Sequence, residues 1–208
     1  NLAKFDFVIQ EEMKGDGHAV LQAREKIGEE AFLVLFGDDL IFNEKSAAVQ
    51  LLDIFEKENA SVVGLQEVVK TEVENYGIAE LKPVLDSTRE SGNRGNNSCE
   101  IEKFVEKPQP SETPSNLAIV GKYVCTPTIF EILEQNPNAS GEIRLIDALQ
   151  ILLEKEKVFG KILAGDRFDC GDKFGLWRAN LELGLQHPEI SKKAECYLRE
   201  IAAREQKN

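Results

Sequence analysis

Two adjacent carboxylates, Asp38 and Asp39, follow an apolar run and a glycine in the stretch LVLFGDDLIF. Neighbouring acids repel one another and resist burial, so the pair costs stability unless a cation, hydrogen bonds or solvent compensate its charge. A third acid, Asp169, lies in RFDCGDKFG, just before a helix that we expect to begin near Asp172. If the ends that carry Asp38 and Asp169 adjoin, the two carboxylates could hold one divalent ion, and Mg²⁺ suits such oxygen ligands. Taken singly, each acid suits a turn or a helix cap at least as well.

A glutamate and a lysine end another expected strand. In FVEKPQP, Glu106 and Lys107 follow a short apolar run and precede Pro108, which ends a strand because it has no backbone N–H. Lys107 can contact a phosphate as a point charge, and Glu106 can accept hydrogen bonds from sugar hydroxyls. By itself, such a pair is more often the solvated edge of a sheet.

Five apolar runs rich in β-branched residues predict the strands that would position these side chains. They cover residues 5–10, 31–36, 61–69, 117–125 and 158–163. Helical patterns lie between several of them, and this alternation predicts an α/β fold with a mostly parallel mixed sheet flanked by helices. Ligands of such sheets bind beyond the carboxyl ends of the strands, where Asp38 is expected to lie.

Apolar residues at helical spacing predict the helices. The face that KSAAVQLLDIFEKEN would bury consists of Ala48, Leu51, Leu52 and Phe55. The corresponding face of GEIRLIDALQILLEKEK consists of Leu145, Ala148, Leu149, Leu152 and Leu153. A third helix should begin at TPTIFEILEQ, with Thr126 as its N-cap and Pro127 at its first position.

The composition favours a soluble protein with a single domain over residues 1–208, because 42% hydrophobic content is enough to build a sizeable core. A net charge of -12 argues against nucleic acid and anionic membranes as partners. The cysteine spacing suits neither a zinc site nor a disulfide framework, so we expect reduced thiols and a cytoplasmic location. Residues 86–98 are expected to form a polar loop and residues 191–208 a C-terminal helix.

Seven segments together resemble the bacterial UTP-glucose-1-phosphate uridylyltransferases, within the wider sugar-nucleotide pyrophosphorylase family. They occur in the family's order and extend over essentially the whole chain. The segments are KGDGHAVLQA, LFGDDL, NYGIAEL, FVEKPQP, PSNLAIVGKYV, GEIRLIDAL and RFDCGDKFG. The ordered set is far more specific than any single piece, such as GDD, would be.

The resemblance implies a nucleotide-diphospho-sugar transferase fold of the GT-A-like kind, and it also implies which reaction is catalysed. Such enzymes join UTP and glucose 1-phosphate into UDP-glucose, release pyrophosphate and use Mg²⁺. The small-molecule partners would be these substrates, with a homo-oligomer as a possible assembly. The implied metal ligands are Asp38 and Asp169, which with Lys107 at the sugar phosphate form the implied catalytic set. The implied nucleotide contacts are Gln10, Met13, Gly15 and Asp39. The implied sugar contacts are Gly77, Glu106, Lys107 and Val120.

The sequence also departs from the family pattern. Asp16, Arg144 and Ile146 stand where the family more often has an apolar residue, glutamine and threonine. The family's first strand and its loop GxGTRxxPxTK, which holds the triphosphate, do not occur in this sequence. The resemblance therefore implies a downstream part of the catalytic core, with turnover impaired because that loop stabilises the departing pyrophosphate.

Two other functions stay open at this stage. One is a non-catalytic module that binds sugar nucleotides or self-assembles, because missing strands would leave a sheet edge and apolar surface to be covered. The other, a metal-dependent phosphohydrolase, is disfavoured because no nucleophilic DxD motif is present.

Overall fold

The computed structural model describes residues 3–83, 98–113, 115–135 and 141–205. We expected one domain from the sequence, and contacts within the chain form two compact units. Unit 1 consists of Asn1–Leu35 and Asn43–Ala164, and unit 2 consists of Phe36–Phe42 and Gly165–Asn208. No helix in the described part of the chain is both long and apolar enough to cross a membrane.

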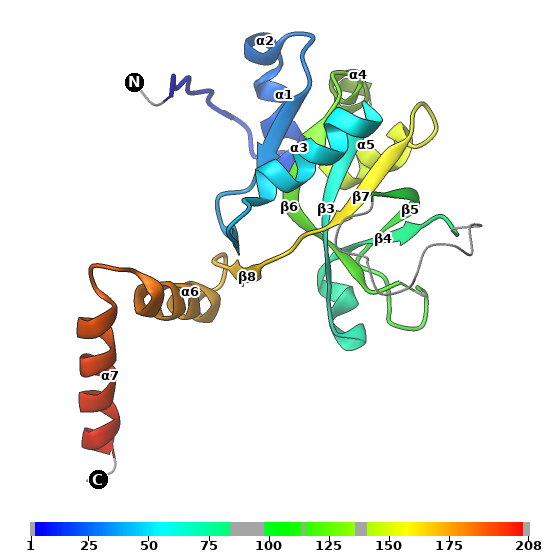
Figure 1. Cartoon of the computed structure of the whole chain (residues 1–208). Helices are drawn as coiled ribbons and strands as arrows, with labels where there is room; N and C mark the ends of the chain where they lie inside the picture. The colour runs from blue at the N-terminus through cyan, green and yellow to red at the C-terminus, as the bar shows by residue number, and fades with distance from the viewer. Residues whose placement is uncertain (1–2, 84–97, 114, 136–140, 206–208) are drawn as a thin grey trace. The chain divides into compact units, whose positions relative to one another are not determined.

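Unit 1 contains a six-stranded sheet in the order β1-β6-β3-β7-β5-β4 (Figure 1). Its strands are β1 (Phe32–Leu35), β3 (Ser61–Glu67), β4 (Gly77–Leu81), β5 (Cys99–Glu106), β6 (Leu117–Cys125) and β7 (Val158–Ile162). The predicted strands at 31–36, 61–69, 117–125 and 158–163 are thus confirmed. Their mostly apolar sequences suit strands that are covered on both faces.

The mixed sheet flanked by helices is as predicted, but the expected excess of parallel pairings is wrong for the described strands. Only β3 and β7 pair in parallel there, and the pairs β1–β6, β3–β6, β4–β5, β4–β6 and β5–β7 are antiparallel. The physical reason is strand direction. Strands β5 and β6 run opposite to β1, β3, β4 and β7, so every pairing of β5 or β6 with one of those four is antiparallel.

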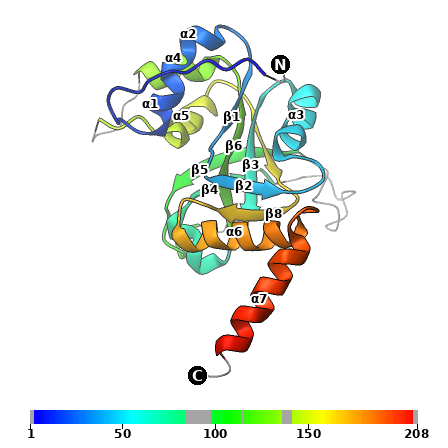
Figure 2. The same ribbon diagram turned by 90° about the vertical axis from the view of Figure 1, so that its left-hand side faces the viewer.

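The helices of unit 1 cover its sheet from two sides. They are α1 (Asp16–Gln22), α2 (Arg24–Ile27), α3 (Ala47–Glu58), the 3₁₀ helix η1 (Lys70–Asn75), α4 (Thr128–Gln135) and α5 (Leu145–Leu152). Helix α3 packs on β3, β6 and β7, whereas α1, α4 and α5 pack against one another. Figure 2 shows α3 on one side of β1 and β6 and this cluster on the other.

Helix α5 buries four of the five predicted residues, and the fifth, Leu153, is half-buried just after the helix, whereas the buried face of α3 is rotated by one residue and keeps Leu51 of the predicted set. Ala47, Leu51 and Ile54 of α3 are buried, and the predicted Ala48, Leu52 and Phe55 are only half-buried. The reason is Gln50, which lies on the same buried face. Its side-chain amide donates to the carbonyl of Ala164 and accepts from the N–H of Ala164, at 2.9 and 2.8 Å, so this polar residue turns inward.

Two other local predictions are wrong. Residues 5–10 form no strand, and Phe5, Phe7 and Ile9 are exposed, because no described strand pairs with them to bury the alternating pattern. Helix α4 begins at Thr128, and the Thr126 hydroxyl donates to Glu156 Oε1 at 2.6 Å instead of serving as the predicted cap. The predicted polar loop lies outside the described residues over 86–97.

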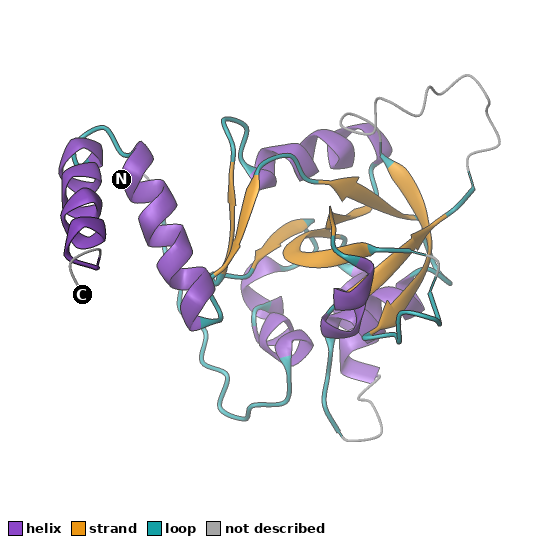
Figure 3. Ribbon diagram, turned by 90° about the horizontal axis from the view of Figure 1, so that it is seen from below, coloured by secondary structure: helices purple, strands orange, loops and turns teal. Residues whose placement is uncertain are grey.

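Unit 2 is a two-stranded antiparallel ladder, built from strands far apart in the sequence, followed by two helices. Strands β2 (Asp39–Phe42) and β8 (Asp166–Asp169) pair antiparallel, and α6 (Lys173–Gln186) and α7 (Ser191–Glu205) follow (Figure 3). Helix α7 confirms the predicted C-terminal helix. Helix α6 begins where expected, because Asp172 Oδ1 accepts from the N–H groups of Phe174 and Gly175 at 2.8 and 3.0 Å.

A glycine lets α6 start close to β8. A Cβ on Gly175 would lie 1.7 Å from the backbone oxygen of Asp169. No side chain can occupy that position, so the spacing between the strand that carries Asp169 and the helix after it requires glycine here.

Candidate active site

The ladder of unit 2 brings Asp38 and Asp169 together. Asp39 is the register partner of Asp169, and the N–H of Cys170 donates to the backbone oxygen of Asp38 at 2.6 Å. A Cβ on Gly171 would meet Asp169 Oδ1 at 3.1 Å and Asp38 Oδ2 at 3.3 Å. Both carboxylates therefore reach the same point above Gly171, which has no side chain to fill it.

The cation that compensates Asp39 is Arg167. Its Nε and Nη2 donate to the two carboxylate oxygens of Asp39 at 2.8 and 3.0 Å, and the two side chains are only 12% and 10% exposed. The sequence analysis missed this arginine. Residues two apart on a strand share a face, so Arg167 lies on the face of β8 that carries Asp169, but this relation follows only once β8 is known to be a strand.

Asp38 and Asp169 remain open to ligands. Asp38 is exposed, and the Asp169 side chain is 50% exposed, with Arg167 Nη2 3.9 Å from its Oδ2. Across the described residues, no group of three or more His, Cys, Asp or Glu side chains is arranged to hold a metal. Two carboxylates fit Mg²⁺, which keeps several waters and binds substrate phosphates, better than they fit a closed zinc site.

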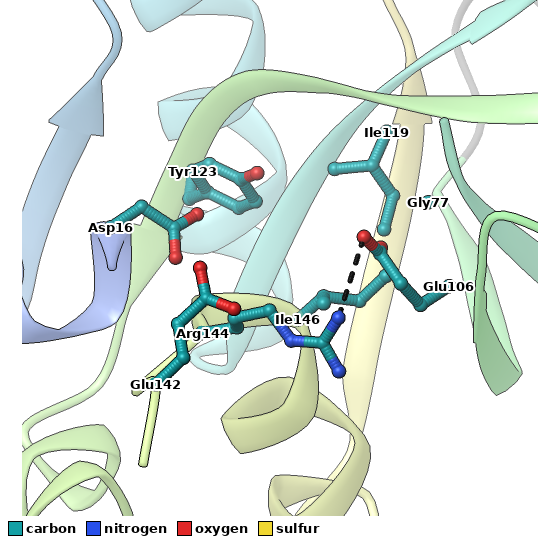
Figure 4. A pocket seen from close by; sticks show the side chains of 8 residues that line it. All are labelled: Asp16, Gly77, Glu106, Ile119, Tyr123, Glu142, Arg144 and Ile146. Carbon is teal, nitrogen blue, oxygen red and sulfur yellow. Dashed lines mark ion pairs between the residues drawn. The ribbon is translucent and has the colours of Figure 1, made fainter. Parts of the chain in front are cut away.

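Unit 1 contains a polar cavity of about 300 Å³ (Figure 4). Its lining residues are Asp16, Gly77, Glu106, Ile119, Tyr123, Glu142, Arg144 and Ile146. The antiparallel pairing of β4 with β5 makes Gly77 the partner of Glu106. A Cβ on Gly77 would lie 2.4 Å from Ile146 Cδ1 and 3.3 Å from Glu106 Oε2, so glycine keeps the cavity open. The motifs NYG and EKP, distant in sequence, thus meet at one wall.

Glu106 lies between two cations. Lys107 Nζ and Arg144 Nη1 are 4.0 and 3.7 Å from its Oε1. Burial raises the pKa of Glu106 above its usual value, while the charges of Arg144 and Lys107 act in the opposite direction. The Lys107 side chain is 61% exposed and does not line the cavity, and its backbone, at φ 46°, donates to the oxygen of Tyr76 at 3.0 Å.

The predicted nucleotide contacts of unit 1 lie in the segment before α1. Gln10 Nε2 donates to the backbone oxygen of Gly15 at 3.0 Å and contacts His18 Nδ1 at 3.0 Å, so this amide braces the loop. Gly15 has φ 102°, and a Cβ there would lie 2.6 Å from the backbone oxygen of Ile143. Met13 is 96% exposed.

The predicted sugar contact Val120 does not line the cavity. Its side chain is fully buried in β6, whereas the preceding Ile119 faces the cavity. Successive side chains of a strand point to opposite faces. The residue next to a pocket-lining one, such as Val120 next to Ile119, is therefore packed in the core.

Comparison with known proteins identifies the family. The family model described as nucleotidyl transferase matches residues 2–185. A UTP--glucose-1-phosphate uridylyltransferase of Staphylococcus epidermidis is 39% identical over 202 residues, which cover 97% of this chain and 67% of that protein. One from Bacillus subtilis is also 39% identical and covers 100% of this chain and 67% of its own length.

Solved structures of UDP-glucose pyrophosphorylases are also similar to this chain. A UDP-glucose pyrophosphorylase from Acinetobacter baumannii has a TM-score of 0.80 and 32% identity, covering 93% of this chain and 65% of that one. A UDP-glucose pyrophosphorylase complexed with UDP-glucose has a TM-score of 0.72 and 32% identity, covering 94% and 66%. The chain thus spans about two thirds of the length of its relatives. It belongs to the nucleotidyl transferase family, and within it to the group of the UTP-glucose-1-phosphate uridylyltransferases.

Proposed function

We propose that this chain provides sugar and metal contacts for transfer of the uridylyl group of UTP to glucose 1-phosphate, which gives UDP-glucose and pyrophosphate. The observation that carries the proposal is the approach of Asp38 and Asp169 to one point above Gly171. Family membership and the cavity around Glu106 support it. A cytoplasmic location and a homo-oligomer stay predictions from the sequence.

The chemistry needs positioning more than proton transfer. A phosphate oxygen of glucose 1-phosphate, already anionic at neutral pH, attacks the α-phosphorus of UTP, and the bond from that phosphorus to the pyrophosphate oxygen breaks. Mg²⁺ bound by Asp38 and Asp169 would supply positive charge for the phosphates. In this scheme Glu106 accepts hydrogen bonds from sugar hydroxyls, and the long, exposed side chain of Lys107 binds the sugar phosphate.

The remaining assignments are part of the same proposal. Gln10, Met13 and Gly15 would frame the uracil, and Gly77 would let the sugar approach the backbone of β4. Asp39 would act next to the nucleotide while bound to Arg167, so its contribution is to position the ladder that carries Asp38 and Asp169.

Calorimetric titration of UDP-glucose into the chain tests the proposal, with Mg²⁺ or with EDTA. We expect Mg²⁺ to strengthen binding about tenfold or more, because it neutralises diphosphate charge. Asp38→Asn and Asp169→Asn should each abolish this gain. Asp166→Asn is the matched control, because it removes an exposed carboxylate from the same strand as Asp169. Equal affinity with Mg²⁺ and EDTA, or a loss in the control as large as in the two variants, would refute the proposed metal site.

A further inference from the structure

Arg144 is the one lining residue of the cavity that carries a positive charge. It precedes the first turn of α5 as the N-cap residue. Its Nε and Nη2 donate to the two carboxylate oxygens of Asp147 at 2.8 and 3.1 Å. Its Nη1 lies 3.7 Å from Glu106 Oε1, the ion pair drawn in Figure 4. Asp147 thus fixes the guanidinium in one orientation, and that orientation aims its remaining nitrogen at Glu106.

The cavity stays acidic despite Arg144. Three lining carboxylates, Asp16, Glu106 and Glu142, face one guanidinium, whose charge the bidentate contact with Asp147 already compensates. Asp16 is held in place, because its Oδ1 accepts from the N–H groups of Gly17 and Leu145 at 2.7 and 3.0 Å. With Lys107 engaged by the sugar phosphate, as in the proposed function, a second anion in this cavity would therefore meet mainly like charges among the lining side chains.

We propose that Arg144 is a positioning residue that holds the Glu106 carboxylate directed at the sugar, and that the acidic cavity excludes sugars bearing a carboxylate. This inference rests on the proposed function, because it takes the cavity to be the sugar site. Its ligand class is a hexose ring that presents neutral hydroxyls. The hydroxyls donate to Glu106, which as an ionised carboxylate is acceptor-only, whereas protonation turns one of its oxygens into an O–H donor.

The pH dependence of binding follows from the charges around Glu106. Burial raises the pKa of Glu106, Arg144 and Lys107 lower it, and Asp147 and Asp16 raise it. Replacing Arg144 with glutamine removes the first of the two lowering charges, so the pKa of Glu106 rises further. Sugar binding that needs the carboxylate is present above this pKa and is lost as the pH falls through it. The acid limb of binding must therefore move to higher pH in Arg144→Gln.

The experiment is calorimetry of the chain with UDP-glucose, UDP-glucuronate and UDP, each with Mg²⁺, from about pH 4 to pH 8. At neutral pH, UDP-glucuronate should bind about tenfold or more weakly than UDP-glucose, because of like-charge repulsion. Arg144→Gln should weaken UDP-glucose about two- to fivefold, leave UDP unchanged and shift the acid limb upward. Arg144→Lys, which keeps the positive charge, should shift the acid limb upward less than Arg144→Gln does. Arg24→Gln, which removes an arginine paired with Glu134 away from the cavity, is the matched control.

The outcomes separate this inference from the proposed function. Equal affinity for UDP-glucuronate and UDP-glucose would overturn it, as would an acid limb that does not move in Arg144→Gln. A greater loss for UDP-glucuronate than for UDP-glucose in that variant would show that Arg144 is an anion receptor, and would also overturn it. In all three cases the proposed function stands, because UDP-glucose still binds. A folded chain that binds neither UDP nor UDP-glucose overturns both.

Discussion

Replacing Arg167 with glutamine removes the charge that compensates the buried carboxylate of Asp39. Breaking one side of a buried ion pair typically costs about 3–5 kcal/mol. The two side chains retain 12% and 10% exposure, so water relieves part of that cost, and we expect about 2–3 kcal/mol for Arg167→Gln. The loss should be confined to unit 2, where both residues lie.

The single tryptophan of the chain makes this measurement local. Trp177 lies on α6 in unit 2, where its ring stacks on Phe174 with centroids 5.6 Å apart. Urea unfolding followed by tryptophan fluorescence therefore reports on unit 2, whereas far-ultraviolet circular dichroism reports on the whole chain. In EDTA and without nucleotide, the fluorescence midpoint of Arg167→Gln should fall well below that of the unsubstituted chain.

A double-mutant cycle decides whether the ion pair is the cause. Asp39→Asn together with Arg167→Gln should lose less stability than the sum of the single changes, with a coupling of about 2 kcal/mol. Arg199→Gln serves as the control, because it removes an exposed arginine of α7 and should cost less than about 0.5 kcal/mol. Strict additivity, or an Arg167→Gln chain as stable as the control, would refute the role assigned to the pair.

Two further predictions use matched residues. Gly175→Ala should be severely destabilising, because its Cβ would lie 1.7 Å from a backbone oxygen, whereas Gly184→Ala in the same helix meets its nearest atom at 3.8 Å and should stabilise by about 0.4–1 kcal/mol. The fluorescence melts compare them, and equal effects would contradict the close start of α6. Burial raises the pKa of Cys125 to about 12, so near pH 8 a thiol reagent should modify the exposed Cys196 and spare Cys125 until the chain unfolds. Mass spectrometry identifies the labelled cysteine, and rapid labelling of Cys125 in the native chain would contradict its burial.

The long strands were predictable because their composition is decisive. Strand β6 occupies the predicted residues 117–125, an apolar run interrupted only by Gly121 and Lys122. The strands β2 and β8 were not predictable in the same way. They have four residues each, and three of the eight are aspartates, which are depleted in strands. Pairing direction was equally hidden, because it depends on the connections and not on the strand's own residues.

The residues of the candidate site were also predictable only in part. Motifs indicated which residue types belong together, and the structure brings Asp38 to Asp169 and Gly77 to Glu106. The motifs did not predict which way each side chain faces. Whether residue 119 or residue 120 faces the cavity depends on which alternate side chains of β6 point to that side of the sheet. The partnership of Arg167 with Asp39 depends on a ladder that the sequence did not reveal.

Asp38, Asp39 and Asp169 differ in how their negative charge is compensated, and this difference bears on the proposed Mg²⁺ site. Asp39 is buried, so its carboxylate needs a partner within the protein, and Arg167 provides one. Asp38 and Asp169 are exposed, so water can solvate them without a ligand. An internal cation as close to these two as Arg167 is to Asp39 would compete with Mg²⁺ for the same oxygens. The ladder instead neutralises the acid that it buries, and it leaves the pair above Gly171 exposed, as the proposed Mg²⁺ site requires.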